Sequence, residues 1–379
     1  MLDYTILRVI WWLLLGILLM GFAIMDGFDL GIGILLPYVS RTNTERRVLL
    51  NTIGPVWEGN QIWLVLGAGA IFAAWPLVYS MVFSGFYFAM LLVLLTLILR
   101  PVGFKYRSKI AHPLWQRMWD TCIFFAGFIP ALLFGVALGN ILQGVPFHFD
   151  DSLRVFYSGT LFDLLNPFGL LCGLTSVALL AMHGGTFLAI KTEGIVQQRA
   201  KRAISLGALL FIILFCLGGY WIANHVPGFM INGAIITDAP SNPLHKQVNM
   251  AIGNWLMNYR IHPYYLAAPI TGLLAALFTI LLSLLRANKT AWFTSSLCVA
   301  ATIGTVGLSM FPFIVPSSTY PNMSLLVWDA SSSKLTLLIM LIATLIFIPI
   351  ILAYTSWIYY VLRGKVKVDD IEKNSKQLY

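Results

Sequence analysis

The chain contains nine long apolar runs, each close to the roughly 20 residues that a helix needs to cross a bilayer. They lie at about 8–36, 50–73, 79–100, 118–143, 162–190, 203–225, 262–285, 291–314 and 335–362. Charged residues make up 10% of the chain and the mean hydropathy is +0.83, which together exclude an ordinary soluble domain. The sequence therefore predicts an all-α integral membrane protein with nine transmembrane helices, in which residues 1–379 form a single polytopic domain.

Basic residues gather in alternate loops, and this pattern predicts the orientation. All but five of the 24 Lys and Arg residues lie after the first, third, fifth, seventh and ninth runs. The exceptions are Arg8, Arg154, Lys246, Arg260 and Lys334. Because cytoplasmic loops carry such an excess, we expect the amino terminus outside and the carboxyl terminus in the cytoplasm. The net charge of +9 is then a topology signal, and its scatter over short loops argues against nucleic-acid binding.

Three carboxylates interrupt the first two runs. Asp26 and Asp29 are three residues apart and so share a helix face, although a carboxylate at bilayer depth costs roughly 2.5–3.5 kcal/mol. At 1.5 Å per residue, Asp29 lies roughly 10 Å and Glu58 roughly 16 Å from the cytoplasmic side, where Arg100 is a candidate counter-ion. These four residues are candidates for a proton route. The alternative is a hydrogen-bonding role between helices, which we favour for Asp26.

Two tryptophans lie beside Glu58 at membrane depth. Trp57 and Trp63 flank the polar pair Asn60 and Gln61, and Gln61 shares a helix face with Glu58. Core packing is the default explanation for buried indoles. The alternative is a wall beside a quinone ring or a dioxygen path, since flat aromatic rings pack well against both.

The sequence indicates no metal or haem site on this chain. Its four cysteines fall in apolar runs without CxxC spacing, so neither a disulfide nor a thiolate metal site is expected. Of the six histidines, His183 alone lies well within a run, so no second histidine is available at equal depth for paired haem ligation. Ligation by methionine stays open.

Motifs of polar and aromatic residues are spread over the whole chain, and together they closely resemble subunit II of the cytochrome bd ubiquinol oxidases. They include Trp11-Trp12, Asp26-Gly27-Phe28-Asp29, Trp57-Glu58-Gly59-Asn60-Gln61-Ile62-Trp63, Arg100-Pro101, Gly139-Asn140, Asn166-Pro167-Phe168-Gly169, Phe311-Pro312-Phe313, Trp328-Asp329 and the closing Leu378-Tyr379.

The resemblance implies two four-helix bundles plus a peripheral helix, in the bacterial cytoplasmic membrane. It implies a partner, subunit I, with two b-type haems and one d-type haem, in a complex that oxidises quinol and reduces dioxygen. Subunit II itself would be haem-free and would support assembly, cytoplasmic proton uptake through Asp29, Glu58 and Arg100, and dioxygen access or a structural ubiquinone near Trp57 and Trp63. Many family members have Asp where this chain has Glu58. Small single-helix accessory subunits stay open.

Two other functions compete with this interpretation. A secondary transporter would carry similar intramembrane carboxylates, but the Gly54-Pro55 break has no counterpart half a chain away, as paired broken helices would require. A purely structural scaffold for subunit I would need the acids for assembly alone.

Overall fold

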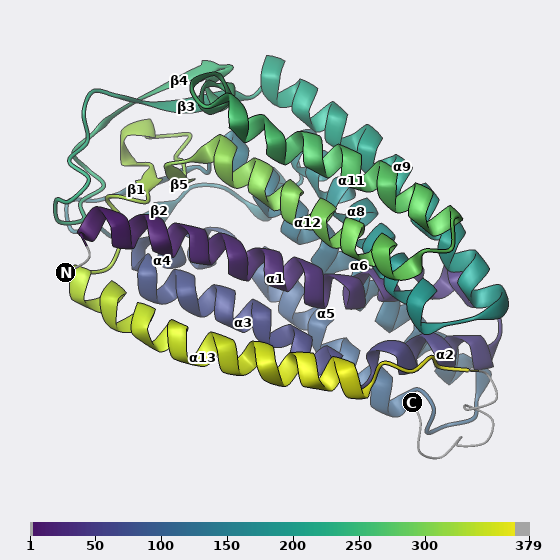
Figure 1. Cartoon of the computed structure of the whole chain (residues 1–379). Helices are drawn as coiled ribbons and strands as arrows, with labels where there is room; N and C mark the ends of the chain where they lie inside the picture. The colour runs from purple at the N-terminus through teal and green to yellow at the C-terminus, as the bar shows by residue number, and fades with distance from the viewer. Residues whose placement is uncertain (1–2, 368–379) are drawn as a thin grey trace.

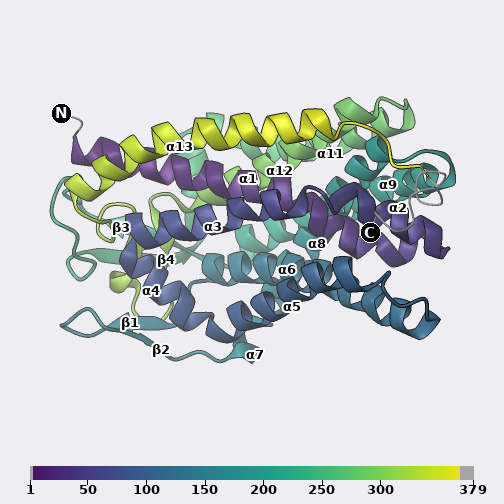
Figure 2. The same cartoon turned by 90° about the horizontal axis from the view of Figure 1, so that it is seen from below.

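The structure, a computed structural model, describes residues 3–367 of the chain. Its long helices run side by side in one elongated bundle (Figure 1, Figure 2). Helix α1 begins at the end where the β-strands gather, and α13 ends at the opposite end, beside α2 (Figure 1). In the predicted orientation, the end with the strands faces outward and the end with α2 faces the cytoplasm.

Within residues 3–367, eight helices are long and apolar enough to cross a membrane. They are α1 (Tyr4–Val39), α5 (Tyr87–Tyr106), α6 (Pro113–Gln143), α8 (Pro167–Lys191), α9 (Gly194–Asn224), α11 (Ala267–Leu284), α12 (Asn288–Met310) and α13 (Lys334–Val361). Helix α3 (Trp57–Ala74) lies alongside α1 but is not among the eight, and its first two turns carry Glu58, Asn60 and Gln61. The ninth span therefore stays a prediction.

Proline and capping residues set several boundaries differently from the apolar runs. The run at 50–73 is not one helix: α2 (Asn43–Ile53) ends before Pro55, and α3 starts at Trp57. The run at 79–100 is divided between α4 (Pro76–Gly85) and α5; Pro76 begins α4, whereas the break between the two helices falls at Phe86, where there is no proline. Proline lacks a backbone N–H and fits the first turn of a helix, so it ends one segment and begins the next. The same chemistry separates α7 (Leu161–Leu164) from α8, where Asn166 caps the helix that Pro167 begins.

The segments between the helices at the strand end are folded, so the expectation of an all-α chain was incomplete. Three antiparallel pairs lie there: β1 (Phe147–Phe149) with β2 (Val155–Tyr157), β3 (Pro227–Asn232) with β4 (Gln247–Ile252), and β5 (Phe313–Val315) with β6 (Leu325–Leu326). Short helical turns follow β4 and β5, at η1 (Asn254–Leu256), α10 (Met257–Ile261), η2 (Pro263–Leu266) and η3 (Pro321–Met323). A buried ion pair between Lys246 and Asp329, 2.7 Å apart, helps hold these loops together. Burial raises the pKa of Asp329 and lowers the pKa of Lys246, and their ion pair opposes both shifts.

Helix α1 is the centre of the bundle. Its residues 26–36 are all buried, because α3, α6, α8, α12 and α13 pack around it. Contacts divide the long helices into one group of α1, α3, α5 and α6 and another of α8, α9, α11 and α12, with α13 against α1 and α3. The two groups also meet through α1, α6 and α8, so the separation into two four-helix bundles stays a prediction.

Helix α2 lies across the end of the bundle opposite the strands. We call this the basic end, because the loops richest in Lys and Arg lie there. Ion pairs connect α2 to neighbouring helices. Glu45 completes a capping box with Thr42 and accepts a hydrogen bond of 2.8 Å from Arg199 of α9. Burial raises the pKa of Glu45, but hydrogen bonds from the backbone N–H groups of Arg41 and Thr42 and from Arg199 outweigh it and hold the pKa below its ordinary value. From the next residue, Arg46 reaches Asp120 of α6 at 2.9 Å.

Candidate functional site

The first buried pair of the candidate site joins α1 to α5. Arg100 Nη1 donates to Asp26 Oδ1 at 2.6 Å, and Nη2 lies 3.5 Å from Oδ2. Asp26 is fully buried and Arg100 is 3% exposed. The counter-ion predicted from the sequence is therefore present, and its direct partner is Asp26. A closely matched charge pair of this kind is far less costly in a membrane protein interior than either charge alone.

The second acid, Asp29, is held by a hydrogen-bonded chain of neutral groups. Asn60 Nδ2 of α3 donates to Asp29 Oδ2 at 2.8 Å, and the Tyr359 hydroxyl of α13 donates to Asn60 Oδ1 at 2.7 Å. Asp29 is 2% exposed, and its other oxygen, Oδ1, has no hydrogen-bond partner among the described residues. With Arg100 of α5, the site thus takes side chains from four helices, α1, α3, α5 and α13, and Tyr359 is a member that the sequence did not reveal.

The remaining polar candidates of α3 do not join this cluster. Glu58 is exposed on the surface of the chain and Gln61 is partly exposed, whereas Asn60 points inward. The structure therefore brings Asp26, Asp29 and Arg100 together with Asn60, and it places Glu58 on the outside of the same helix.

Both tryptophans of α3 are 6% exposed and lie inside the chain. Trp57 packs against Phe104 of α5, with ring centroids 5.7 Å apart. Trp63 lies so close to Gly21 of α1 that a methyl group there would be 2.5 Å from the indole ring. The Trp63 Nε1 atom has no hydrogen-bond partner among the described residues. These are core-packing contacts, and the two indole rings lie on the side of α3 that faces α1 and α5.

His183 connects α8 to the turn of α1 that precedes the two aspartates. Its Nε2 lies 2.9 Å from the Ile24 carbonyl oxygen and its Nδ1 lies 2.8 Å from the Ser295 hydroxyl of α12. Because a carbonyl can only accept, Nε2 carries the proton and donates it to Ile24. His183 is fully buried, so it contributes to the fixed position of α1 at the depth of the acids.

We expect His183→Leu to lower the free energy of unfolding by about 1–3 kcal/mol, the usual cost when a buried polar group loses its partner. In this variant the Ser295 hydroxyl loses its hydrogen bond to the ring nitrogen, and the Ile24 carbonyl loses a donor. His183→Gln retains an N–H donor and should recover much of the stability. The measurement is the thermal midpoint of the detergent-purified protein, and equal midpoints for the two variants would contradict the hydrogen-bonding role.

Comparison with known proteins decides the family. The family model for cytochrome bd terminal oxidase subunit II matches residues 7–362. The chain belongs to this family. It is 48% identical to the cytochrome bd-I ubiquinol oxidase subunit 2 of Escherichia coli strain K12, with all of both chains covered. It is also 31% identical to the cytochrome bd ubiquinol oxidase subunit 2 of Bacillus subtilis, over 95% of this chain and 97% of the relative.

A solved structure supports the fold. The bd oxidase from Geobacillus thermodenitrificans matches with a TM-score of 0.67 at 16% identity, over 94% of this chain and 98% of that chain. The resemblance found in the sequence is therefore confirmed: the chain is a subunit of an oxygen-reducing quinol oxidase. Its eight membrane-capable helices and its family make it a multi-pass protein of the bacterial inner membrane.

Proposed function

We propose that this chain is the haem-free subunit of its bd-type oxidase and that it takes protons from the cytoplasm through Asp29 for a haem-bearing partner, subunit I. The observation that carries the proposal is the free carboxylate oxygen of a deeply buried acid. Asp29 Oδ1 has no partner among the described residues, and Asp29 takes part in none of the ion pairs found in residues 3–367. A proton can therefore bind Oδ1 without first displacing another group.

The neighbouring ion pair gives Asp29 a fixed electrostatic setting. Asp26 and Arg100 carry opposite charges 2.6 Å apart, so their sum is zero and the net charge of the cluster depends on Asp29. An ionised Asp29 leaves one uncompensated negative charge in a buried site, and protonation removes it. Because a buried isolated charge is costly, the cluster can alternate between two states that differ by one proton while the charge pair stays in place.

In this proposal, Glu58 carries out the next step, the transfer of protons from this chain to subunit I. A carboxylate that faces hydrocarbon costs roughly 2.5–3.5 kcal/mol, yet Glu58 is exposed on a helix face with Ile62 and Val65, which are 42% and 68% exposed. We infer that subunit I covers this face of α3. Glu58 would then lie at the interface and hand protons on to the partner, where the family resemblance assigns the b-type and d-type haems that reduce dioxygen.

A second candidate role is dioxygen access or the binding of a quinone. An apolar groove of about 450 Å³ lies between α1, α3 and α13, with Leu18, Val65 and Phe347 in its lining. The groove begins within a turn of Trp63 on α3, and its apolar walls suit dioxygen or an isoprenoid chain. Trp57 and Trp63 would form the inner boundary of such a path in this proposal.

The test of the proton route is Asp29→Asn, which keeps the shape of the side chain and removes its proton-binding oxygen. We expect the complex to retain its haem spectrum while quinol oxidase turnover falls about tenfold or more, within the range of general acid–base contributions. Asp151→Asn, on an exposed residue at the strand end, is the matched control and should turn over at the parental rate.

Either of two results would decide against the proposal. An Asp29→Asn complex with full haem content and parental turnover would leave a scaffold role as the function of this chain. Haem that stays bound to this chain after its separation from the partner would contradict the haem-free assignment.

A further inference from the structure

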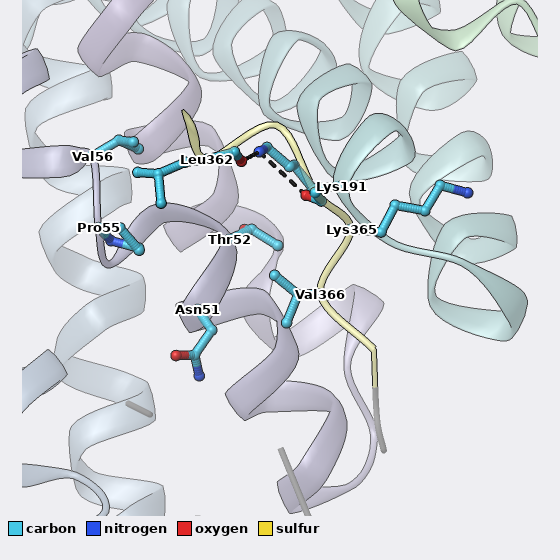
Figure 3. Close-up of a pocket in the computed structure, with 9 residues that line it drawn as sticks. Asn51, Thr52, Pro55, Val56, Lys191, Leu362, Lys365 and Val366 are labelled. Atoms are coloured by element: carbon cyan, nitrogen blue, oxygen red, sulfur yellow. Dashed lines mark hydrogen bonds between the residues drawn. The ribbon is translucent and has the colours of Figure 1, made fainter. Parts of the chain in front are cut away.

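A pocket of about 220 Å³ opens at the basic end of the bundle, between the end of α2, the start of α3 and the ends of α8 and α13 (Figure 3). Its lining includes Thr52, Pro55, Val56, Lys191, Leu362 and Val366. Figure 3 shows these side chains around one space, with the last turn of α13 and the segment after it along one side. None of the residues predicted from the sequence lines this pocket.

The pocket lies near the hydrogen-bonded chain that ends on Asp29, along both α3 and α13. The Asn60 backbone N–H donates to the carbonyl of Val56, a lining residue, at 3.1 Å. Leu362, which also lines the pocket, follows Tyr359 by three residues at the end of α13. At 1.5 Å per residue, the pocket is therefore about one helical turn, or roughly 5 Å, from the Asn60–Tyr359 hydrogen bond.

The hydrogen bond from Tyr359 fixes which way the Asn60 amide faces. Tyr359 donates to Oδ1, which leaves Nδ2 to donate to Asp29. An N–H donor is a good partner for a carboxylate, whereas a protonated Asp29 would favour an acceptor. Tyr359 thus selects the amide orientation that keeps Asp29 ready to receive a proton. Without the hydroxyl, both orientations of Asn60 become available.

Lys191 shapes the rim of this pocket. Its ammonium donates to the carbonyl oxygens of Leu362 and Gly364 (Figure 3). Its own carbonyl accepts from the backbone N–H of Val366 at 2.9 Å. These bonds satisfy carbonyl groups that the end of α13 leaves unpaired. They also hold the end of α13 against α8, so the opening has a fixed shape.

We propose that this pocket is the entrance by which cytoplasmic protons reach Asp29, and that Tyr359 is a positioning residue acting through Asn60. The inference rests on the proposed role of Asp29 in proton uptake and adds the place of entry and the group that orients the acceptor. The transferred species is a proton alone, passing from water in the pocket to the Asp29 carboxylate.

The first test is Tyr359→Phe in the complete oxidase complex. We expect kcat to fall about fivefold, as for the loss of one hydrogen bond, with unchanged KM for quinol and an increased solvent deuterium isotope effect. Tyr360→Phe is the matched control, because Tyr360 is 63% exposed and packs on Arg363. A Tyr359→Phe complex with the kcat and isotope effect of Tyr360→Phe would overturn the positioning role.

The second test closes the pocket after the complex has assembled, so it does not depend on how a variant folds. A side chain at Gly364 would meet no heavy atom within 4 Å, so Gly364→Cys should fold like the parent. A bulky, membrane-impermeant methanethiosulfonate added to cytoplasm-out vesicles should then reduce turnover at least fivefold, and dithiothreitol should restore it. The parent carries four free cysteines, Cys216 among them exposed, and is treated identically as the control.

The two proposals fail in different ways. Full turnover of modified Gly364→Cys, alongside slow Asp29→Asn, would place the entrance elsewhere and leave the role of Asp29 intact. Parental turnover of Asp29→Asn would remove the proton route, and the pocket would lose its proposed role with it.

Discussion

Arg100→Met is expected to leave little assembled oxidase in the membrane. The substitution removes the ion-pair partner of Asp26, which is fully buried. Removal of one partner from a buried ion pair costs about 3–5 kcal/mol, because the remaining charge has no compensation. The measurement is the haem-containing complex recovered in mild detergent, together with its thermal midpoint.

A double variant separates the charge effect from loss of packing. Asp26→Leu combined with Arg100→Met removes both charges and keeps apolar volume, and such replacements of buried pairs are often close to neutral. We therefore expect the double variant to recover most of the complex that Arg100→Met loses. If the double variant is as unstable as Arg100→Met, the unpaired carboxylate of Asp26 does not cause the loss of complex. The cause is then the lost packing of the long arginine side chain between α1 and α5.

The sequence predicted the parts of the site that depend on spacing along one helix. Asp26 and Asp29 are three residues apart, so their common face of α1 followed from helix geometry. The depth of Arg100 followed from its place at the end of the third apolar run. These features need no knowledge of how helices pack, and the structure indeed gathers the three residues at one level of α1.

What the sequence could not supply is the rotation of one helix against another. Arg100 pairs with Asp26 and not Asp29, which depends on how α5 faces α1. Helix α3 is apolar on nearly every side of its last three turns, so no amphipathic pattern told Asn60, which faces inward, from Glu58, which faces out. Tyr359 lies 299 residues after Asn60 and near a helix end, where a tyrosine is ordinarily read as part of the interfacial aromatic belt.

The four shortest strands, β1, β2, β5 and β6, were missed because of their length. Strands β5 and β6 are three and two residues long, and segments of that length carry no periodic signal. Helix ends and apolar side chains bury the loops at this end of the bundle. The backbone N–H and C=O groups of each loop must therefore pair with one another, and the short strands are the result.

Gly31→Ala is expected to separate α1 from α8 and to disturb the acid site with it. A methyl group at Gly31 would lie 2.0 Å from the backbone oxygen of Leu180 and 3.1 Å from the Cα atom of Gly184. Backbone atoms cannot rotate away as a flexible side chain can, so one helix must move. Such overpacking typically costs about 1–3 kcal/mol, and the movement would lengthen the bond between Asn60 and Asp29, two residues along α1.

The control lies on the same helix. Gly16 of α1 has no heavy atom within 4 Å of an added methyl group, and alanine favours a helix over glycine by about 1 kcal/mol. Gly16→Ala should therefore match or exceed the thermal midpoint of the parent and turn over normally, while Gly31→Ala lowers both. The contrast isolates close helix contact from helix propensity, because both variants make the same substitution in the same helix. Equal thermal midpoints for the two variants would mean that α8 can move away at Leu180 without loss of stability. The geometry of Asp29 would then not depend on the close contact between α1 and α8.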